Sequence, residues 1–338
     1  MIREAIEALT NERRDLSEEE AAATMQEIFT GEATPAQLAA FLIALRLKGE
    51  TVDEIAGMAR VMREHALRVR VEGPLLDTCG TGGDGKGTFN VSTAAAFVAA
   101  GAGARVAKHG NRAMSSGCGS ADVLEALGAK IDLTPEQVAE CIEKTGFGFM
   151  FAQAFHPAMK YAAATRREIG VRTAFNILGP LTNPAHAQSQ LLGVARPELA
   201  TLMASALEKL GSRHVLVVHS RDGCDELTLD GPCHVTEMSA GISQDYLLSG
   251  HEIGLPETPS SAIKGGSAEQ NAAILTAVLT GEKGPYRDVV LFNAAAALVA
   301  ADIAKDPAEG LASATDSIDS GTAKRRMDAF VELSASFA

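Results

Sequence analysis

The sequence contains no tryptophan, and aromatic residues make up only 4% of it. Proteins that bind single-stranded nucleic acid usually combine aromatic stacking platforms with a basic groove. Basic residues are also in the minority, with 30 Lys and Arg against 43 Asp and Glu and a net charge of −13. We therefore expect no nucleic-acid partner, because such binding needs a basic surface that displaces counterions. A few Lys and Arg residues could still form a local pocket for phosphate.

Paired cysteines and long apolar runs are also missing. The five cysteines are odd in number and contain no CxxC pair, which favours reduced thiols in a cytosol over disulfides or a zinc site. No stretch of about 18 apolar residues is present, so we expect no membrane-spanning segment. The first residues, MIREAIEALTNERRDLSEEE, are amphipathic and acidic, unlike a signal peptide. These absences predict a cytoplasmic protein.

The first 72 residues show only helical patterns. The chain has 338 residues, about two domains at roughly 150 each. Helix-opening caps occur at three places: Ser17 with Glu20, Thr34 with Pro35, and Thr51 with Glu54. The run AAFLIALRL that follows Pro35 is apolar around much of its circumference. Such a helix needs cover on several sides, either within its own domain or from a partner subunit.

After Gly73-Pro74, short β-type runs alternate with helical ones. The expected strands cover residues 75–78, 105–107, 147–151, 191–194, 215–218 and 234–238, and the expected helices include 92–100, 135–144 and 197–210. This alternation predicts an α/β fold with a mostly parallel central sheet flanked by helices. The last seventy residues are Ala-rich and helical. We predict a small all-helical domain over 1–72, which the helical segment 156–185 could complete, and a larger α/β domain over 73–338.

A glycine-rich loop follows the first expected strand. It runs from Gly80 to Gly85 and leads through Asn90 into a helix that begins near Ser92 and Thr93. Glycines let backbone N–H groups converge on an anion, and the hydroxyls lie at the positive end of the helix dipole. The alternative is a flexible turn with no ligand. The loop contains the letter patterns GxGxxG of dinucleotide-binding sites and GxxxxGK of P-loops, but the neighbouring residues fit neither motif. A dinucleotide site requires an acid after the next strand, where Lys108 stands, and a P-loop requires Ser or Thr where Gly87 stands.

Basic residues at the end of the second expected strand of the α/β domain are expected to lie beside the glycine-rich loop. Lys108, His109, Gly110, Asn111 and Arg112 follow one another and are followed by Ser115-Ser116. Two cations and two hydroxyls suit several phosphate groups. Asp84 in the glycine loop would repel phosphate unless it binds a ribose hydroxyl or faces a metal. Together the two strand ends predict a site for a sugar that carries phosphates at more than one position.

Two further segments carry candidate ligands. Asp225 and Glu226 follow the strand HVLVV, and adjacent carboxylates on a loop suit Mg²⁺, although acidic pairs are also common on any acidic surface. Arg166 lies near the end of a helix that starts at about Pro157. Its guanidinium could bind a substrate carboxylate, or it could compensate the helix dipole or pair with Glu168.

These segments resemble the anthranilate phosphoribosyltransferase family over nearly the whole chain. The resemblance rests on CGTGGDG, NVST, KHGNR with Ser115-Ser116, GFMFAQAFHPAMK, RRE at 166–168, NILGPLTNP and DGCDELT. GTGGD and KHGNR are shared more widely with pyrimidine nucleoside phosphorylases, and the later segments narrow the match. The resemblance implies use of Mg²⁺, with two ions accompanying phosphoribosyl pyrophosphate (PRPP), and a homodimer built through the helical domain.

The resemblance also implies a role for each matching residue. The residues expected to bind PRPP are Gly80, Gly83, Asp84, Thr88, Asn90, Val91, Ser92, Thr93, Lys108, His109, Gly110, Asn111, Arg112, Ser115, Ser116 and Ser120. The residues expected to bind anthranilate are Gly80, His109, Asn111 and Arg166, of which His109 and Arg166 are the candidate catalytic residues. The expected metal ligands are Ser92 for one ion and Asp225 and Glu226 for the second. This chain departs from the family at Ser220, where Gly is common, and at Cys224, where Leu is usual.

The expected reaction transfers 5-phosphoribosyl from PRPP to the amine of anthranilate and releases pyrophosphate, a step in tryptophan biosynthesis. Such a reaction would proceed through a loose transition state with positive charge on the ribose, so electrostatics and positioning would dominate catalysis. The aromatic amine is uncharged at neutral pH, and we nominate no general base. The alternatives are a pyrimidine nucleoside phosphorylase, a non-catalytic nucleic-acid-binding relative of the same fold, and a simple metabolic binding protein.

Overall fold

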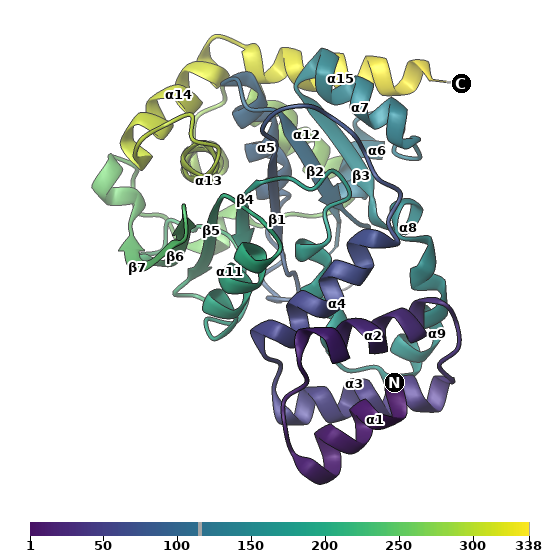
Figure 1. Cartoon of the computed structure of the whole chain (residues 1–338). Coiled ribbons are helices and arrows are strands. Elements are labelled where there is room, and N and C mark those ends of the chain that lie inside the picture. Colours follow the sequence, from purple (N-terminus) through teal and green to yellow (C-terminus); the bar gives the residue numbers. More distant parts are fainter. Residues whose placement is uncertain (114–116, 338) are drawn as a thin grey trace.

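A computed structural model describes residues 1–113 and 117–337 of the chain (Figure 1). A group of helices near the N-terminus lies at one end of the molecule, and a twisted sheet covered by helices forms the rest. This is the predicted combination of a helical part and an α/β part. The core divides into two clusters of buried apolar side chains, one on each side of the sheet's centre.

Short, well-capped helices form the N-terminal part. Their bounds are α1 Ile2–Glu7 with a π-helical turn Ala8–Glu12, α2 Glu18–Phe29, α3 Pro35–Lys48 and α4 Val52–Glu64. Side-chain oxygens of Ser17, Thr34 and Thr51 accept hydrogen bonds from the backbone three residues later, so all three predicted caps are confirmed. Three later helices, α8 Ala152–Phe155, α9 Lys160–Ile169 and α10 Phe175–Leu178, follow the third strand. Figure 1 shows α9 beside α2 and α3, with which it is in contact.

The apolar run in α3 is covered mainly by its own chain. Leu38, Phe41 and Leu45 are almost completely buried in the cluster that also contains Ala162 and Phe175. Leu47, in contrast, is 82% exposed. The intramolecular alternative therefore accounts for most of this helix, and one large apolar side chain at its end stays open to solvent.

Seven strands form one sheet in the order β3-β2-β1-β4-β5-β6-β7. Their bounds are β1 Leu76–Gly80, β2 Val106–Gly110, β3 Phe147–Phe151, β4 Ser189–Gly193, β5 His214–Ser220, β6 Cys233–Ser239 and β7 Ile242–Leu248. The first five are parallel and the last two antiparallel. Six strands were predicted within three residues at each end, and the mostly parallel sheet is confirmed.

The seventh strand was missed because its sequence pattern is weak. β7 is an edge strand whose first five residues are mostly exposed, including Ile242 at 70%. Its hairpin turn consists of Ala240 and Gly241, both with positive φ. Such turns favour Asn or Asp before Gly, so the alanine hid the turn signal.

Helices cover both faces of the sheet. The remaining helices are α5 Val91–Gly101, α6 Ser120–Ala126, α7 Pro135–Thr145, α11 Leu199–Lys209, α12 Ala268–Leu279, α13 Pro285–Ala300, α14 Pro307–Asp319 and α15 Thr322–Ser336, with short 3₁₀ turns at Pro157–Met159, Gly179–Leu181, Gly250–Ile253 and Ser260–Ile263. Alternate strand residues serve the two faces. Leu191 and Leu216 join the core around α5 and α13, whereas Leu192 and Val217 join the core around α11 and the N-terminal helices. Among the described residues, no helix is both long and apolar enough to cross a bilayer.

The strand order changes direction between β1 and β4. The chain leaves β1 toward β2 on one side of the sheet, and β4 is followed by β5 on the other. In open α/β sheets, ligands bind outside the carboxyl ends of the strands at such a switch point. The glycine loop after β1, the basic segment after β2 and the acidic loop after β5 all leave the sheet at that edge.

The opposite edge carries a histidine held between two carboxylates. His214 Nδ1 lies 2.7 Å from Asp302 Oδ1, and its Nε2 lies 2.9 Å from Glu237 Oε1. Burial lowers the pKa of His214, but the hydrogen bonds with Glu237 and Asp302 outweigh burial and leave the pKa raised. The folded state therefore favours the protonated imidazole.

A His214→Asn variant should lose stability in a pH-dependent way. Because the folded pKa is raised, the stabilisation is full below the unfolded pKa of about 6.5 and is lost as pH rises through the folded value. Urea unfolding should show a larger free-energy difference between wild type and variant at pH 6 than at pH 9. The exposed His251, replaced by Asn, is the control and should show no such trend. A constant difference across this range would contradict the assignment.

Candidate active site

The glycine loop turns sharply where β1 ends. Gly82, Gly83, Gly85 and Gly87 have φ values of 69°, 72°, 71° and 63°, a region that residues with a Cβ rarely adopt. The N–H of Gly82 donates to Asp225 Oδ2 at 2.6 Å, across 143 positions of sequence. The loop is thereby joined to the acidic segment that follows β5.

Two glycines without positive φ permit this close approach. A Cβ at Gly80, the last residue of β1, would collide with the Asp225 carboxylate. A Cβ at Gly193, the last residue of β4, would collide with the backbone carbonyl of Asp225. The acidic loop therefore lies directly on two neighbouring strand ends, and only glycine fits at either position.

Ser220 shapes the acidic loop in place of the glycine common in the family. Its hydroxyl donates to the carbonyl oxygen of Glu226 and accepts from the N–H of Thr228 at 3.0 Å. Asn293 of α13 accepts from the N–H of Leu227 at 3.1 Å. Both departures noted in the sequence are accommodated, since Cys224 is fully buried beside the loop.

Ser92, at the start of α5, contacts both the acidic loop and a buried lysine. Glu226 Oε1 accepts from the N–H of Ser92 at 3.3 Å, and Lys108 Nζ lies 3.2 Å from Ser92 Oγ. Lys108 is 1% exposed, and its ammonium group also donates to the carbonyl oxygen of Thr78. The structure thus brings together Gly80, Ser92, Lys108 and Glu226, which the sequence placed on four different segments.

Asp77, in β1, interacts electrostatically with this lysine. It is fully buried, accepts from the N–H of His109 at 3.2 Å, and accepts from Asn183 Nδ2 at 2.8 Å. Burial raises the pKa of Asp77 to about 6, while the charge of Lys108 opposes that rise. Sequence reasoning missed both Asp77 and the role of Asn183, although the NILGPLTNP segment contains the latter.

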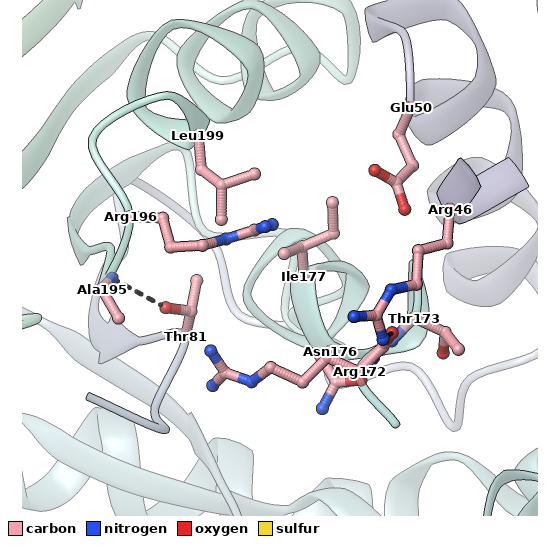
Figure 2. A pocket seen from close by; sticks show the side chains of 10 residues that line it. All are labelled: Arg46, Glu50, Thr81, Arg172, Thr173, Asn176, Ile177, Ala195, Arg196 and Leu199. Carbon is pink, nitrogen blue, oxygen red and sulfur yellow. Dashed lines mark hydrogen bonds between the residues drawn. The ribbon is translucent and has the colours of Figure 1, made fainter. Parts of the chain in front are cut away.

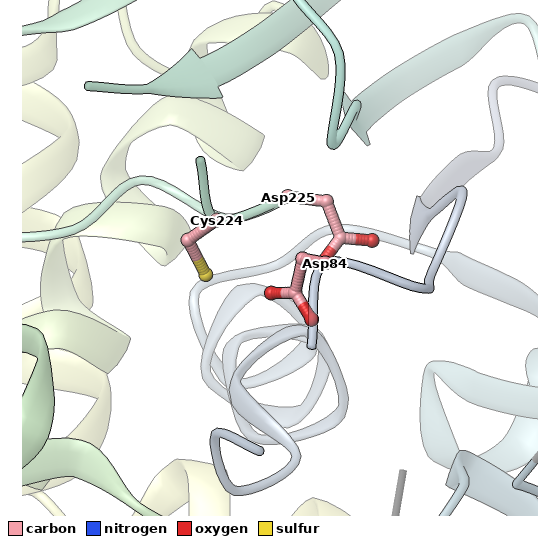
Figure 3. Close-up of side chains that lie close together, drawn as sticks. All are labelled: Asp84, Cys224 and Asp225. Atoms are coloured by element: carbon pink, nitrogen blue, oxygen red, sulfur yellow. The ribbon is translucent and has the colours of Figure 1, made fainter. Parts of the chain in front are cut away.

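Three potential metal ligands gather at the mouth of the loop. Ligand atoms of Asp84, Cys224 and Asp225 lie within 4.8 Å of one another (Figure 3). Burial and nearby carboxylates raise the pKa values of Asp225 and Glu226, so a neighbouring cation would favour the ionised form of both groups. Carboxylate oxygens beside a phosphate-binding loop fit a hard divalent cation such as Mg²⁺.

Two of the expected acceptor residues, His109 and Asn111, lie within β2 and just after its end. The rings of His109 and His156 are 5.0 Å apart, and burial lowers the pKa of both, which keeps them neutral. Asn111 Oδ1 accepts from Gln153 Nε2 at 3.4 Å. His156 was not predicted as a site residue, although it lies within the GFMFAQAFHPAMK segment.

Arg166 is available to bind an anion. Its guanidinium lies 4.9 Å from the ring centre of Phe175 and, among the described residues, has no hydrogen-bond or ion-pair partner. Burial lowers its pKa. The alternative ion pair with Glu168 is not formed in the structure. No direct contact joins Arg166 to His109 or Asn111 in the described part of the chain.

The other expected PRPP residues are distributed around the same edge. The side-chain amide of Asn90 donates to the carbonyl oxygen of Cys118 at 3.2 Å. Thr88 forms an isolated β-bridge with Lys264. The Ser120 hydroxyl lies 3.3 Å from the carbonyl oxygen of Asn111. The buried Thr93 hydroxyl finds no partner among the described residues. Val91 begins α5, and Gly110 ends β2. Ser115 and Ser116 lie outside the described residues.

Arg112 is engaged elsewhere in this structure. Its guanidinium pairs with Asp122 at 3.0 Å and with Glu125 at 2.9 Å, both on α6. To contact a phosphate, the guanidinium of Arg112 would have to release one of these carboxylates or bind the phosphate alongside them.

A cavity of about 180 Å³ lies on the helical side of the glycine loop (Figure 2). Arg46, Arg172 and Arg196 line it, together with Thr81 at the start of the loop. Arg172 donates to the carbonyl oxygen of Gly82 at 2.6 Å. Nothing in the sequence pattern marked this arginine, because its partner is a backbone atom 90 positions away.

Comparisons with known proteins agree over both parts of the chain. The helical bundle domain of a glycosyl transferase family matches residues 3–66, and the α/β domain of that family matches residues 72–324. The fold and the site therefore define a glycosyltransferase of two-domain architecture.

Curated relatives and solved structures narrow this class. Anthranilate phosphoribosyltransferases from Chloroflexus aurantiacus and Roseiflexus castenholzii are 59% and 60% identical to the chain, covering 98% and 95% of both partners. The crystal structure of the Thermus thermophilus enzyme has 49% identity and a TM-score of 0.92, with 98% of each chain covered. The Saccharomyces cerevisiae enzyme in complex with PRPP and Mg has 29% identity and a TM-score of 0.91, covering 99% of this chain and 98% of that one. The chain belongs to the anthranilate phosphoribosyltransferase family.

A Gly80→Ala substitution should weaken divalent-metal binding, because the new methyl group would displace the Asp225 carboxylate. We expect a loss of roughly 10- to 100-fold in Mn²⁺ affinity, the range typical when support of a metal ligand is removed. Electron paramagnetic resonance titration of Mn²⁺ measures this loss directly. Gly179→Ala is the matched control, since a Cβ there meets open space. Equal affinities in the two variants would show that Asp225 does not bind the metal.

Proposed function

We propose that the chain transfers the 5-phosphoribosyl group of PRPP to the amine of anthranilate, with release of pyrophosphate, in tryptophan biosynthesis. The observation that carries this proposal is the convergence of Lys108, Ser92 and the Asp225–Glu226 pair on the glycine loop. Cation, hydroxyl, backbone amides and metal-type carboxylates at one strand edge suit a pyrophosphate better than a single phosphate.

The glycine loop and the start of α5 would hold the pyrophosphate. Backbone N–H groups of the loop and the Ser92 and Thr93 hydroxyls lie at the positive end of an 11-residue helix. Lys108 would add a buried positive charge, which the carboxyl group of Asp77 favours. These groups are fixed before the substrate arrives, so they can stabilise the charge that develops on the leaving group without reorganisation.

Asp225 and Glu226 would hold one Mg²⁺ ion, and Ser92 would contact another. When bound, the metal would neutralise part of the pyrophosphate charge. The raised pKa values of the acidic pair fit this role, because such carboxylates are ionised most readily beside a cation. We propose two ions; the Saccharomyces cerevisiae relative is described with PRPP and Mg.

Arg166, Asn111 and His109 would position the acceptor. A half-buried guanidinium without a carboxylate partner suits the carboxylate of anthranilate. His109 is neutral and adds no charge near the amine. Because the aromatic amine is uncharged at neutral pH, its lone pair can attack the anomeric carbon as pyrophosphate leaves, and a strong base is unnecessary. A solved structure of the yeast relative is described with 4-fluoroanthranilate.

The rival functions have less support. A pyrimidine nucleoside phosphorylase would need one phosphate site and no acidic pair beside it. A nucleic-acid-binding relative is disfavoured by the net charge of −13. The near-full-length relatives named above favour the phosphoribosyltransferase.

We also propose a division of the chain into a helical domain over 1–72, completed by 156–185, and an α/β domain over 73–338. Support comes from the shared core of Phe41, Ala162 and Phe175. We propose a homodimer through the helical domain, where Leu47 and Tyr161 are 82% and 45% exposed. The five free cysteines support a cytoplasmic location.

The decisive assay follows the fluorescence of anthranilate with PRPP and Mg²⁺, with a chelator as the metal-free control. Arg166→Ala should raise KM for anthranilate roughly 10- to 100-fold, because a charge-assisted hydrogen bond is lost, while KM for PRPP changes little. Arg167→Ala is the matched control, since Arg167 is exposed and lies next in sequence. Equal increases in both KM values would place Arg166 outside the acceptor pocket.

A further inference from the structure

Arg172 contacts the glycine loop from the side opposite the metal-type carboxylates. Its Nη2 donates to the carbonyl oxygen of Gly82 at 2.6 Å, and the N–H of the same glycine donates to Asp225 Oδ2 at 2.6 Å. One residue of the loop is thus held at both polar atoms of its backbone. Because Gly82 has a positive φ and no side chain, these two bonds are what fix its orientation.

The backbone of Arg172 is anchored in the helical part of the molecule. Arg46 of α3 donates to the Arg172 carbonyl oxygen at 2.5 Å (Figure 2). The N–H of the next residue, Thr173, donates to Asn176 Oδ1 at 2.9 Å, and Ala174 and Phe175 are buried with the N-terminal helices. The side chain of Arg172 therefore reaches from this helical core to the loop.

The packing against Gly83 shows that Arg172 and the loop fit each other closely. A Cβ at Gly83 would overlap the Arg172 guanidinium. The guanidinium therefore occupies the space that a side chain at this position would need. Arg196 lines the same cavity, but its guanidinium instead approaches Glu198 at 3.7 Å and has no other side-chain partner in the described part of the chain.

We infer that Arg172 is a positioning residue that sets the conformation of the phosphate-binding loop and couples it to the position of the helical domain. This inference rests on the proposed function, because it takes the glycine loop to be the pyrophosphate cradle. Arg172 acts through Gly82 and Gly83 and does not itself touch the substrate. Movement of the helical part relative to the sheet would pull on Gly82 and change how its N–H meets Asp225.

Steady-state kinetics separate this role from a general effect of charge. Arg172→Ala should raise KM for PRPP roughly tenfold or more, the loss expected for a hydrogen bond from a charged donor, with little change in KM for anthranilate. Arg172→Lys should recover part of the loss, because an ammonium group can still donate to one carbonyl. Arg196→Ala removes the same charge from the same cavity and should leave KM for PRPP unchanged. Matching effects of the Arg172 and Arg196 variants would overturn the inference.

A double-mutant cycle tests the contact itself. Gly83→Ala should cost more affinity for PRPP in the wild type than in the Arg172→Ala background, because the alanine displaces the guanidinium only where it is present. Backbone strain from the positive φ is the same in both backgrounds and cancels. Additive effects would overturn the inference.

Calorimetric titration of PRPP with Mg²⁺ and no acceptor gives the readout for this cycle. If the wild type binds PRPP but does not consume anthranilate, the proposed acceptor is wrong while the cycle still decides the role of Arg172.

Discussion

The site depends on carboxylate groups that are buried near the C-terminal ends of the parallel strands. Asp77, Asp225 and Glu226 are carboxylates at or near these strand ends, with a single buried ammonium group, that of Lys108, among them. Isolated charges of this kind are costly to bury unless they are paired or bind a metal. One lysine cannot balance three carboxylates. Burial raises the pKa values of all three groups, and neighbouring carboxylates add to the rise at Asp225 and Glu226. A divalent cation accompanied by phosphate would compensate this charge, and it is the ligand that we propose for the site.

Glycine placement makes this electrostatic arrangement possible. Gly80 and Gly193 end adjacent parallel strands and allow the Asp225 backbone and side chain to lie against them. Further along the loop, Gly82 and Gly83 adopt left-handed conformations that direct a backbone N–H at the carboxylate. Side chains at these positions would separate the phosphate-binding loop from the proposed metal ligands. The glycines are therefore needed for this close approach as well as for the backbone conformation of the loop.

Much of the fold and of the site could be predicted from the sequence, because helix caps, strands and clustered charges produce recognisable local patterns. The caps at Ser17, Thr34 and Thr51, the parallel strands and the Lys108 segment all depend on neighbouring residues, and a strand order with β1 and β4 adjacent then brings distant loops together. Contacts of side chains with distant backbone atoms produce no such pattern in the sequence. Arg172 and Asn183 donate to the carbonyl oxygens of Gly82 and Ala107, which lie 90 and 76 positions away in the sequence. Strand β7 pairs at an exposed edge through a turn that contains alanine. Sequence patterns report residue types, and these interactions depend on where the backbone passes.

The most direct test of the account is a crystal structure of the chain with PRPP and Mn²⁺, with the metal located by its anomalous scattering. We expect manganese bound by the carboxylates of Asp225 and Glu226, with the pyrophosphate lying between the glycine loop and Lys108. Manganese bound away from both carboxylates, with PRPP in another cavity, would contradict it.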